Sequence, residues 1–182
     1  MDHWKAIMLW FLTITVVEGA LDSLETPWGK IVLFNLAVSL CGVLDYYYGR
    51  LFNSLTALLA LMGLVVMVLD PALALAESLA GAGVFGSSLL LIRWLSRGGM
   101  GTGDVKFGAA AGIWLGPVSA VTALNLAFWL GAVYALWFWY KRGNFKWEAR
   151  KMTIPFGPCL AWGSSLAMAF GGKIMAVCLG LV

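Results

Sequence analysis

The sequence is poor in charged residues. Asp, Glu, Lys and Arg make up 12% of its 182 residues, whereas they make up about 25% of a soluble domain. Hydrophobic residues account for 62%, against about 45–50% in soluble domains. So little polar sequence excludes a separate soluble domain, and we expect one helical domain embedded in a membrane.

The residues that usually build metal and redox sites are also scarce. His3 is the only histidine, and its neighbours Trp4 and Lys5 indicate a side chain at the membrane surface. The cysteines form no Cys-x-x-Cys pair and no zinc-ligand spacing; they are Cys41, Cys159 and Cys178. We therefore expect no metal and no cofactor. No basic stripe indicates nucleic-acid binding.

Long apolar runs are what the sequence does contain, and they predict an all-α, polytopic membrane bundle of about seven helices. We expect these helices at residues 4–17, 28–46, 54–69, 79–95, 105–115, 119–140 and 154–181. Residues 1–30 would form an N-terminal helix with a short external loop, and residues 31–182 a six-helix core. The first run has a second interpretation, a cleavable signal peptide.

Basic residues are strongly biased toward one set of predicted helix ends. Ten of the twelve Lys and Arg fall there, and Lys30 falls at the opposite ends. Because basic loops stay in the cytoplasm, we expect an inner-membrane protein with its N-terminus, Asp45 and Asp104 on the cytoplasmic side. The ten basic residues are Lys5, Arg50, Arg93, Arg97, Lys106, Lys141, Arg142, Lys146, Arg150 and Lys151.

Asp104 opens an apolar helix, in Gly101-Thr102-Gly103-Asp104-Val105-Lys106. A charged side chain in a membrane helix is costly and marks a candidate functional site. Gly101 and Gly103 permit a tight turn and the close approach of another backbone, so we expect them to present Asp104 to a cleft. Lys106 has two interpretations: it extends to the membrane surface, or it contacts the aspartates or a substrate.

A glycine ridge follows Asp104. Gly108, Gly112 and Gly116 recur every four residues, so they line one face of the helix and allow a neighbouring helix to pack closely. Close packing of this kind would also bring the helix of Asp104 near other helices of the bundle.

Asp45 closes another apolar run, residues 31–44, at the same predicted membrane face as Asp104. By itself it is also consistent with a helix-end residue near water. Two close carboxylates share a proton and titrate as a pair. The ionised member can take a proton from water while the protonated member polarises a carbonyl. The pair therefore predicts an aspartyl protease that acts at a membrane surface.

The motifs around both aspartates resemble those of the type IV prepilin peptidases. Gly101 to Lys106 is similar to the family's Gly-x-Gly-Asp-x-Lys signature. Asp45, Arg50 and Asn53 resemble its first motif, in which a basic stretch and Ile-Pro-Asn follow the aspartate. Leu51-Phe52 stands where the family has Ile-Pro, so the usual proline is missing.

Two further segments resemble the same family, so the resemblance extends from about residue 31 to the C-terminus. Residues 110–116 are one of them. The other, Pro155-Phe156-Gly157-Pro158, is similar to the Pro-Phe-Gly-Pro that begins the family's last helix. Pro155 and Pro158 indicate a simple helix start. Alternatively, they break the helix and leave backbone groups that pair with an extended substrate.

The resemblance implies a function. Its members are polytopic aspartyl proteases that remove the short basic leader of prepilin or pseudopilin precursors, after a glycine, at the cytoplasmic face. It implies Asp45 and Asp104 as the catalytic pair. Many members carry an N-terminal insert with paired Cys-x-x-Cys motifs, which is linked to N-methylation. This sequence has no such insert, so it resembles the short form and implies cleavage without methylation.

Two other classes of function remain open at this stage. A small transporter or channel could use Asp45 and Asp104 as proton or cation sites. It would show an internal repeat or broken helices in corresponding halves, and no repeat is evident. A catalytically silent assembly subunit of a pilus or secretion system would tolerate Asp→Asn changes at both positions. The sequence identifies neither the precursor nor the oligomeric state.

Overall fold

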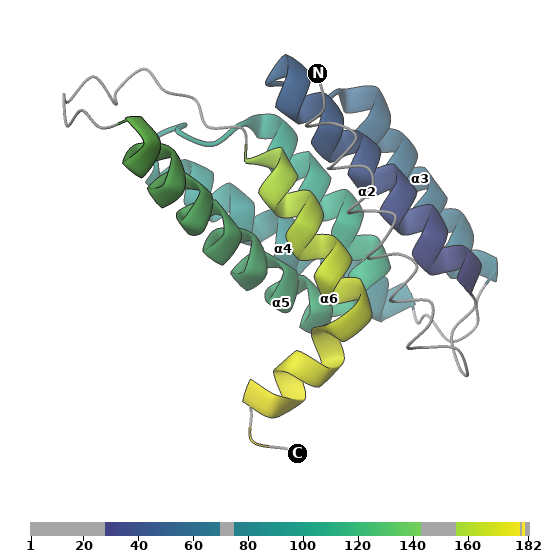
Figure 1. Ribbon diagram of the computed structural model, residues 1–182. Helices are drawn as coiled ribbons and strands as arrows, with labels where there is room; N and C mark the ends of the chain where they lie inside the picture. Colours follow the sequence, from purple (N-terminus) through teal and green to yellow (C-terminus); the bar gives the residue numbers. More distant parts are fainter. Residues whose placement is uncertain (1–27, 70–74, 143–155, 179, 181–182) are drawn as a thin grey trace.

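The computed structural model describes residues 28–69, 75–142, 156–178 and 180, and these form an all-helical bundle (Figure 1). The predicted helix at residues 4–17, Pro155 and residues 143–151 of the basic loop lie outside the described residues. The helices are α2 (Trp28–Tyr48), α3 (Asn53–Leu69), α4 (Leu75–Leu95), α5 (Thr102–Arg142) and α6 (Gly157–Cys178).

The predicted count of seven helices is not matched exactly: the described residues form five, and the first predicted helix lies outside them. The predicted helices at residues 105–115 and 119–140 are joined in α5, which contains a non-helical residue, Gly116, at φ 68° and ψ 175°. Asp104 and Phe128 line one cavity, although a straight helix would place residues this far apart in sequence about 36 Å from each other. The chain therefore reverses at Gly116, and α5 consists of two arms.

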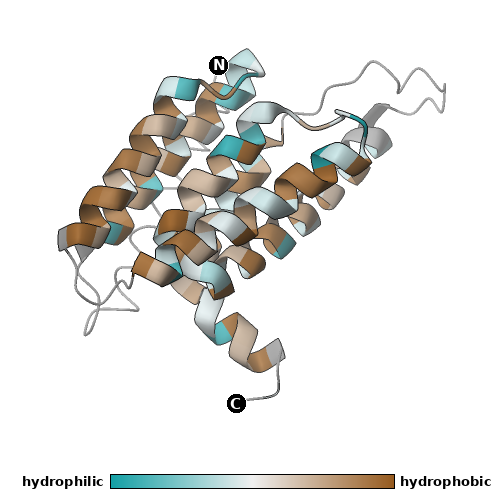
Figure 2. Cartoon of the chain, turned by 180° about the vertical axis from the view of Figure 1, so that it is seen from behind, coloured by the Kyte–Doolittle hydropathy of each residue, from teal (hydrophilic) through white to brown (hydrophobic). Residues whose placement is uncertain are grey.

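Among the described residues, four helices are long and apolar enough to cross a membrane: α2, α4, α5 and α6. Helix α3 is more apolar than these four but has 17 residues. Hydrophobic residues are distributed along the full length of the helices (Figure 2). Large apolar side chains are also exposed on the outside of the bundle, such as Leu36 on α2 and Trp129 on α5. These features are those of a multi-pass membrane protein.

The predicted glycine ridge packs α5 against α4. A Cβ atom on Gly112 would lie 2.4 Å from the carbonyl oxygen of Gly81, and one on Gly108 would lie 2.4 Å from Leu89. At Gly112, where the contact is with backbone, only glycine permits such a close approach. The predicted close packing is confirmed for Gly108 and Gly112, which fix the first arm of α5 against α4. Gly116, predicted on the same helix face, is instead the non-helical residue at which the chain reverses.

Helices α2, α3 and α6 complete the bundle around the two arms of α5. Helix α6 lies between α2 and the second arm of α5 (Figure 1). Helix α3 is joined to the first arm by Trp114, whose indole N–H donates to the carbonyl oxygen of Leu59 at 3.0 Å. The Trp114 ring also packs on Phe34 of α2, with 5.5 Å between the ring centroids. Asp45 on α2 and Asp104 on α5 are thus carried by helices that share one core.

Candidate active site

Asp45 lies in the last turn of α2 and is 6% exposed. The helix ends at Tyr48. Gly49, the next residue, has a φ of 61° and donates its N–H to the carbonyl oxygen of Asp45 at 2.7 Å. The side chain binds another helix: its Oδ2 accepts the N–H of Gly157, the first residue of α6, at 3.0 Å. A Cβ on Gly157 would lie 2.4 Å from this oxygen, so the contact requires glycine.

Asp104 lies in the first turn of α5 and is 8% exposed. The loop before it turns at Arg97 and Gly98, which have φ values of 51° and 86°. The Arg93 guanidinium donates to the carbonyl oxygen of Met100 and so ties this loop to α4. Gly101 and Gly103, which the sequence predicts in a tight turn, are not among the described glycines with a positive φ.

Gly101 and Gly103 serve close approach, as the sequence predicted. A Cβ on Gly101 would lie 3.2 Å from Oδ2 of Asp104. A Cβ on Gly103 would lie 2.8 Å from the Cβ of Leu51, in the connection between α2 and α3. Leu51, directly before the position of the missing family proline, therefore packs against the segment that presents Asp104.

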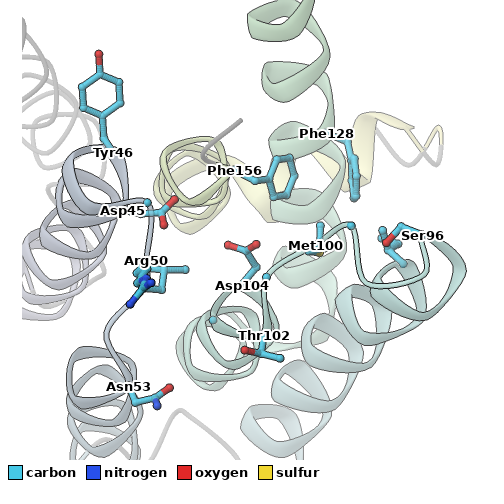
Figure 3. A pocket seen from close by; sticks show the side chains of 16 residues that line it. Asp45, Tyr46, Arg50, Asn53, Ser96, Met100, Thr102, Asp104, Phe128 and Phe156 are labelled. Carbon is cyan, nitrogen blue, oxygen red and sulfur yellow. The ribbon is translucent and has the colours of Figure 1, made fainter. Parts of the chain in front are cut away.

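Both aspartates line one cavity of about 910 Å³. Figure 3 shows that their carboxylates point into it from α2 and α5. The cavity lies where α2 and α4 end and α3 and α5 begin. The residues that line it are Asp45, Tyr46, Gly49, Arg50, Leu51, Asn53, Ile92, Ser96, Gly99, Met100, Gly101, Thr102, Gly103, Asp104, Phe128 and Phe156.

The predicted supporting residues differ in what they contact. Arg50 and Asn53 line the cavity. Lys106 donates from Nζ to Oδ1 of Asn53 at 2.8 Å, so it connects the segments that carry the two aspartates. Pro158 is the second residue of α6. That position leaves its missing N–H without consequence, in agreement with a simple helix start.

Sequence analysis missed one wall of the cavity. Phe128 belongs to the second arm of α5 and reaches the site because the chain reverses at Gly116. Phe156 was noted as part of a motif but received no function. The signal for Phe128 was the Gly116-Pro117 pair, which marks a break in a helix, although it does not specify the direction of the next helix.

The described residues contain no group of three or more His, Cys, Asp or Glu side chains that could hold a metal ion. Two carboxylates held at one end of a helical membrane bundle define a class of membrane protein with a paired-aspartate site.

The chain belongs to the type IV leader peptidase family, which matches residues 31–136. This range includes both aspartates and ends within the second arm of α5. No solved structure matches the chain significantly.

Relatives in several bacteria agree with this assignment. A prepilin leader peptidase/N-methyltransferase of Xanthomonas campestris pv. campestris is 32% identical over 153 residues, covering 76% of this chain and 51% of that protein. Its namesake in Burkholderia pseudomallei is 32% identical over 166 residues, covering 86% and 52%. A type 4 prepilin-like proteins leader peptide-processing enzyme of Escherichia coli is 33% identical over 96 residues, covering 50% and 32%. The chain spans about half the length of the first two relatives.

Proposed function

We propose that this chain is an integral membrane aspartyl endopeptidase that removes the basic leader of type IV prepilin-like precursors. Asp45 and Asp104 are its catalytic pair. One observation carries the proposal: two carboxylates from different helices, 6% and 8% exposed, lie in one cavity large enough for a peptide segment. The names of the relatives supply the class of substrate.

The proposed reaction is hydrolysis with one proton shared by the pair. The ionised carboxylate takes a proton from water, and the water oxygen bonds to the scissile carbonyl carbon. The protonated carboxylate gives its proton to the carbonyl oxygen. The C–N bond then breaks as a proton passes to the leaving amine, and the pair is left with one proton, as at the start. Nothing in these steps requires a metal or an organic cofactor.

The charge distribution supports a cytoplasmic active site in the inner membrane. Arg50, Arg93 and Arg97 lie at the cavity end of the helices, as does Lys106 at the start of α5. Since basic segments stay in the cytoplasm, the cavity would open there. The leader would remain in the cytoplasm while the hydrophobic helix of the precursor lies in the bilayer against residues 31–182, the proposed catalytic core.

We extend the proposal to cleavage without N-methylation, which the resemblance to short-form members implies. The mass of the new N-terminus, measured after cleavage in the presence of a methyl donor, tests this part separately. An unmodified product agrees with it, and a methylated product from the purified chain contradicts it.

The main test is cleavage of a prepilin from the same genome by the purified protein in detergent or nanodiscs. The matched control is the double variant Asp45→Asn/Asp104→Asn, with its fold checked by thermal unfolding. We expect the wild type to release the leader and the folded variant not to. Equal processing by both would remove the aspartates from the mechanism, and no processing of any pilin-like precursor would favour a transporter or an assembly subunit.

A further inference from the structure

The second arm of α5, at the left edge of the bundle in Figure 1, carries an amide on its outer face. Ala123 and Ala127 are 0% exposed and face α6, because a Cβ on Gly163 of α6 would lie within 2.7 Å of the backbone of Ala127 and 2.6 Å from that of Ala123. Asn125, midway between these alanines, lies about 200° around the helix from each and is exposed. Its side chain therefore lies on the face of the arm opposite α6.

Asn125 also lies deep in the apolar part of the arm. The apolar span of α5 ends at Trp137. At about 1.5 Å per residue, Asn125 is about 14 Å from Gly116, where the chain reverses, and about 18 Å from Trp137. A hydrocarbon core is about 30 Å thick and holds no water. Asn125 therefore faces the middle of the bilayer, whereas Asn35 is buried and Asn53 lies at the start of α3.

Within the described residues, the hydrogen bonding of this amide is incomplete. Nδ2 of Asn125 donates to the carbonyl oxygen of Val121, one turn earlier, at 2.9 Å. An asparagine amide has a second N–H and an acceptor oxygen, and neither has a partner in the described part of the chain. Such groups are costly in hydrocarbon, and asparagines in membrane helices bond across to other helices. The amide therefore indicates that another helix packs on this face.

The exposed residues around Asn125 are spaced for such packing. Val118, Asn125 and Ala132 are seven residues apart, and Trp129 and Leu136 lie between and after them at alternating steps of four and three. All five are exposed. This is the heptad spacing along which two helices pack with a left-handed crossing. None of the five lines the cavity of Asp45 and Asp104, so a helix on this seam would leave the cavity residues uncovered.

The partner that fits this seam is a second copy of the chain. Two copies in one membrane have the same orientation, so their second arms can pack in parallel about a two-fold axis, where each residue meets its equivalent. The two Asn125 amides would then face each other, and each has both the donor and the acceptor that the other needs. A single asparagine in a heptad seam fixes the register and the number of paired helices.

We propose that this chain forms a dimer in the membrane through the seam of the second α5 arm, with the two Asn125 amides hydrogen-bonded across the two-fold axis. The dimer goes beyond the proposed function and does not depend on it. Its first test is energy transfer between donor- and acceptor-labelled copies of the full chain in lipid vesicles, without any precursor. Dilution with lipid gives the dissociation constant.

Three variants assign the dimer to the seam. Asn125→Leu should raise the dissociation constant about 3- to 20-fold, as the loss of a hydrogen bond between membrane helices does. Asn125→Gln keeps the amide and should stay within about threefold of the wild type. The matched control is Ser87→Leu, which also removes an exposed polar group bonded within its own helix, here α4; it should leave the dissociation constant unchanged.

Oxidative cross-linking locates the contact independently. Asn125→Cys should give a disulfide-linked dimer, because residues at a two-fold axis come within the roughly 4.4–6.8 Å between Cα atoms that a disulfide spans. Leu90→Cys, at a residue on α4 that is 55% exposed, is the control and should not. The wild type, which keeps the native cysteines, sets the background.

The outcomes decide the proposal. Weaker association of Asn125→Leu together with cross-linking at residue 125 and not at residue 90 supports it. A wild type that stays monomeric at every lipid dilution overturns it, as does a dimer that Asn125→Leu leaves unchanged. If Asn125→Leu does not fold, equal cross-linking at residues 125 and 90 overturns the seam. Cross-links of Asn125→Cys to a co-expressed precursor, or within one chain, in place of a dimer also overturn it, because another helix would then occupy this face.

Discussion

Asp104 lies in the first turn of its own helix, whereas Asp45 lies in the last turn of its own. A carboxylate is favoured at the start of a helix and disfavoured at the end, by about 0.3–1 kcal/mol in each case. Asp45 obtains the favourable environment from elsewhere, by accepting the N–H of Gly157 at the start of α6. The position of Asp104 is therefore determined locally, and that of Asp45 by a residue 112 positions away.

Asp45 and Asp104 are positioned in different ways, but the proposed hydrolysis requires both carboxylates. We expect Asp45→Asn and Asp104→Asn each to lower the cleavage rate about 10²- to 10⁴-fold, the contribution of general acid–base catalysis. Asn caps a helix about as well as Asp, so Asp45→Asn should keep the contact with α6 and remain folded. Single-turnover cleavage, measured together with thermal unfolding, checks both points. A folded single variant with near-normal rate would show that its aspartate is not catalytic.

The substitution Gly157→Ala tests most directly whether Asp45 depends on α6 for its position. A methyl group there would lie 2.4 Å from the carboxylate oxygen, so Gly157→Ala must displace Asp45 or the start of α6. We expect kcat to fall about 100-fold, as a displacement of about 1 Å can cause, with a smaller change in KM. Steady-state kinetics on a prepilin substrate measure this.

The matched control for Gly157→Ala is Gly172→Ala, in the same helix. Gly172 has nothing within 4 Å of an added Cβ, and alanine favours helix by about 1 kcal/mol over glycine. We expect this variant to keep full activity and equal or greater stability. If both variants lost activity alike, flexibility of α6, and not the contact with Asp45, would be the cause.

The local support of Asp104 is tested at Gly103. A Cβ there would meet the Cβ of Leu51 at 2.8 Å and separate the start of α5 from the α2–α3 connection. Because Asp104 moves together with its own helix start, we expect a loss of about 10-fold in kcat, smaller than that for Gly157→Ala. Gly83→Ala on α4, which meets nothing within 4 Å, is the control. A larger loss at Gly103 than at Gly157 would reverse the comparison.

The same difference explains what the sequence could predict. Apolar runs and the Gly-Asp turn are local features, so they gave the ranges of α2 and α3 within two residues and the surroundings of Asp104. Helix α4 begins at Leu75 instead of residue 79, because Glu77 is an acid in the first turn and favours a helix start there. The contact of Asp45 with Gly157 and the arrival of Phe128 depend on how distant helices pack, which local patterns do not encode.

One hydrogen bond connects α5, which carries Asp104, to the start of α3, the helix that follows Asp45. Lys106, two residues after Asp104, donates to Asn53, at the start of the helix that follows Asp45. Both side chains are exposed, so water competes for the bond and its net contribution should be about 0.5–1 kcal/mol. We expect Lys106→Met and Asn53→Ala each to lower kcat about two- to fivefold, and the double variant to be no worse than either.

A double-mutant cycle on kcat measures this coupling directly. Losses that overlap in the double variant would mean that the bond joins the segments of Asp45 and Asp104 into one unit. Losses that multiply would mean that each side chain acts by itself, with Lys106 serving only as a charge at the membrane surface. Lys106→Arg, which keeps a donor, distinguishes the bond from simple charge: it should recover most of the activity only if Asn53 is present.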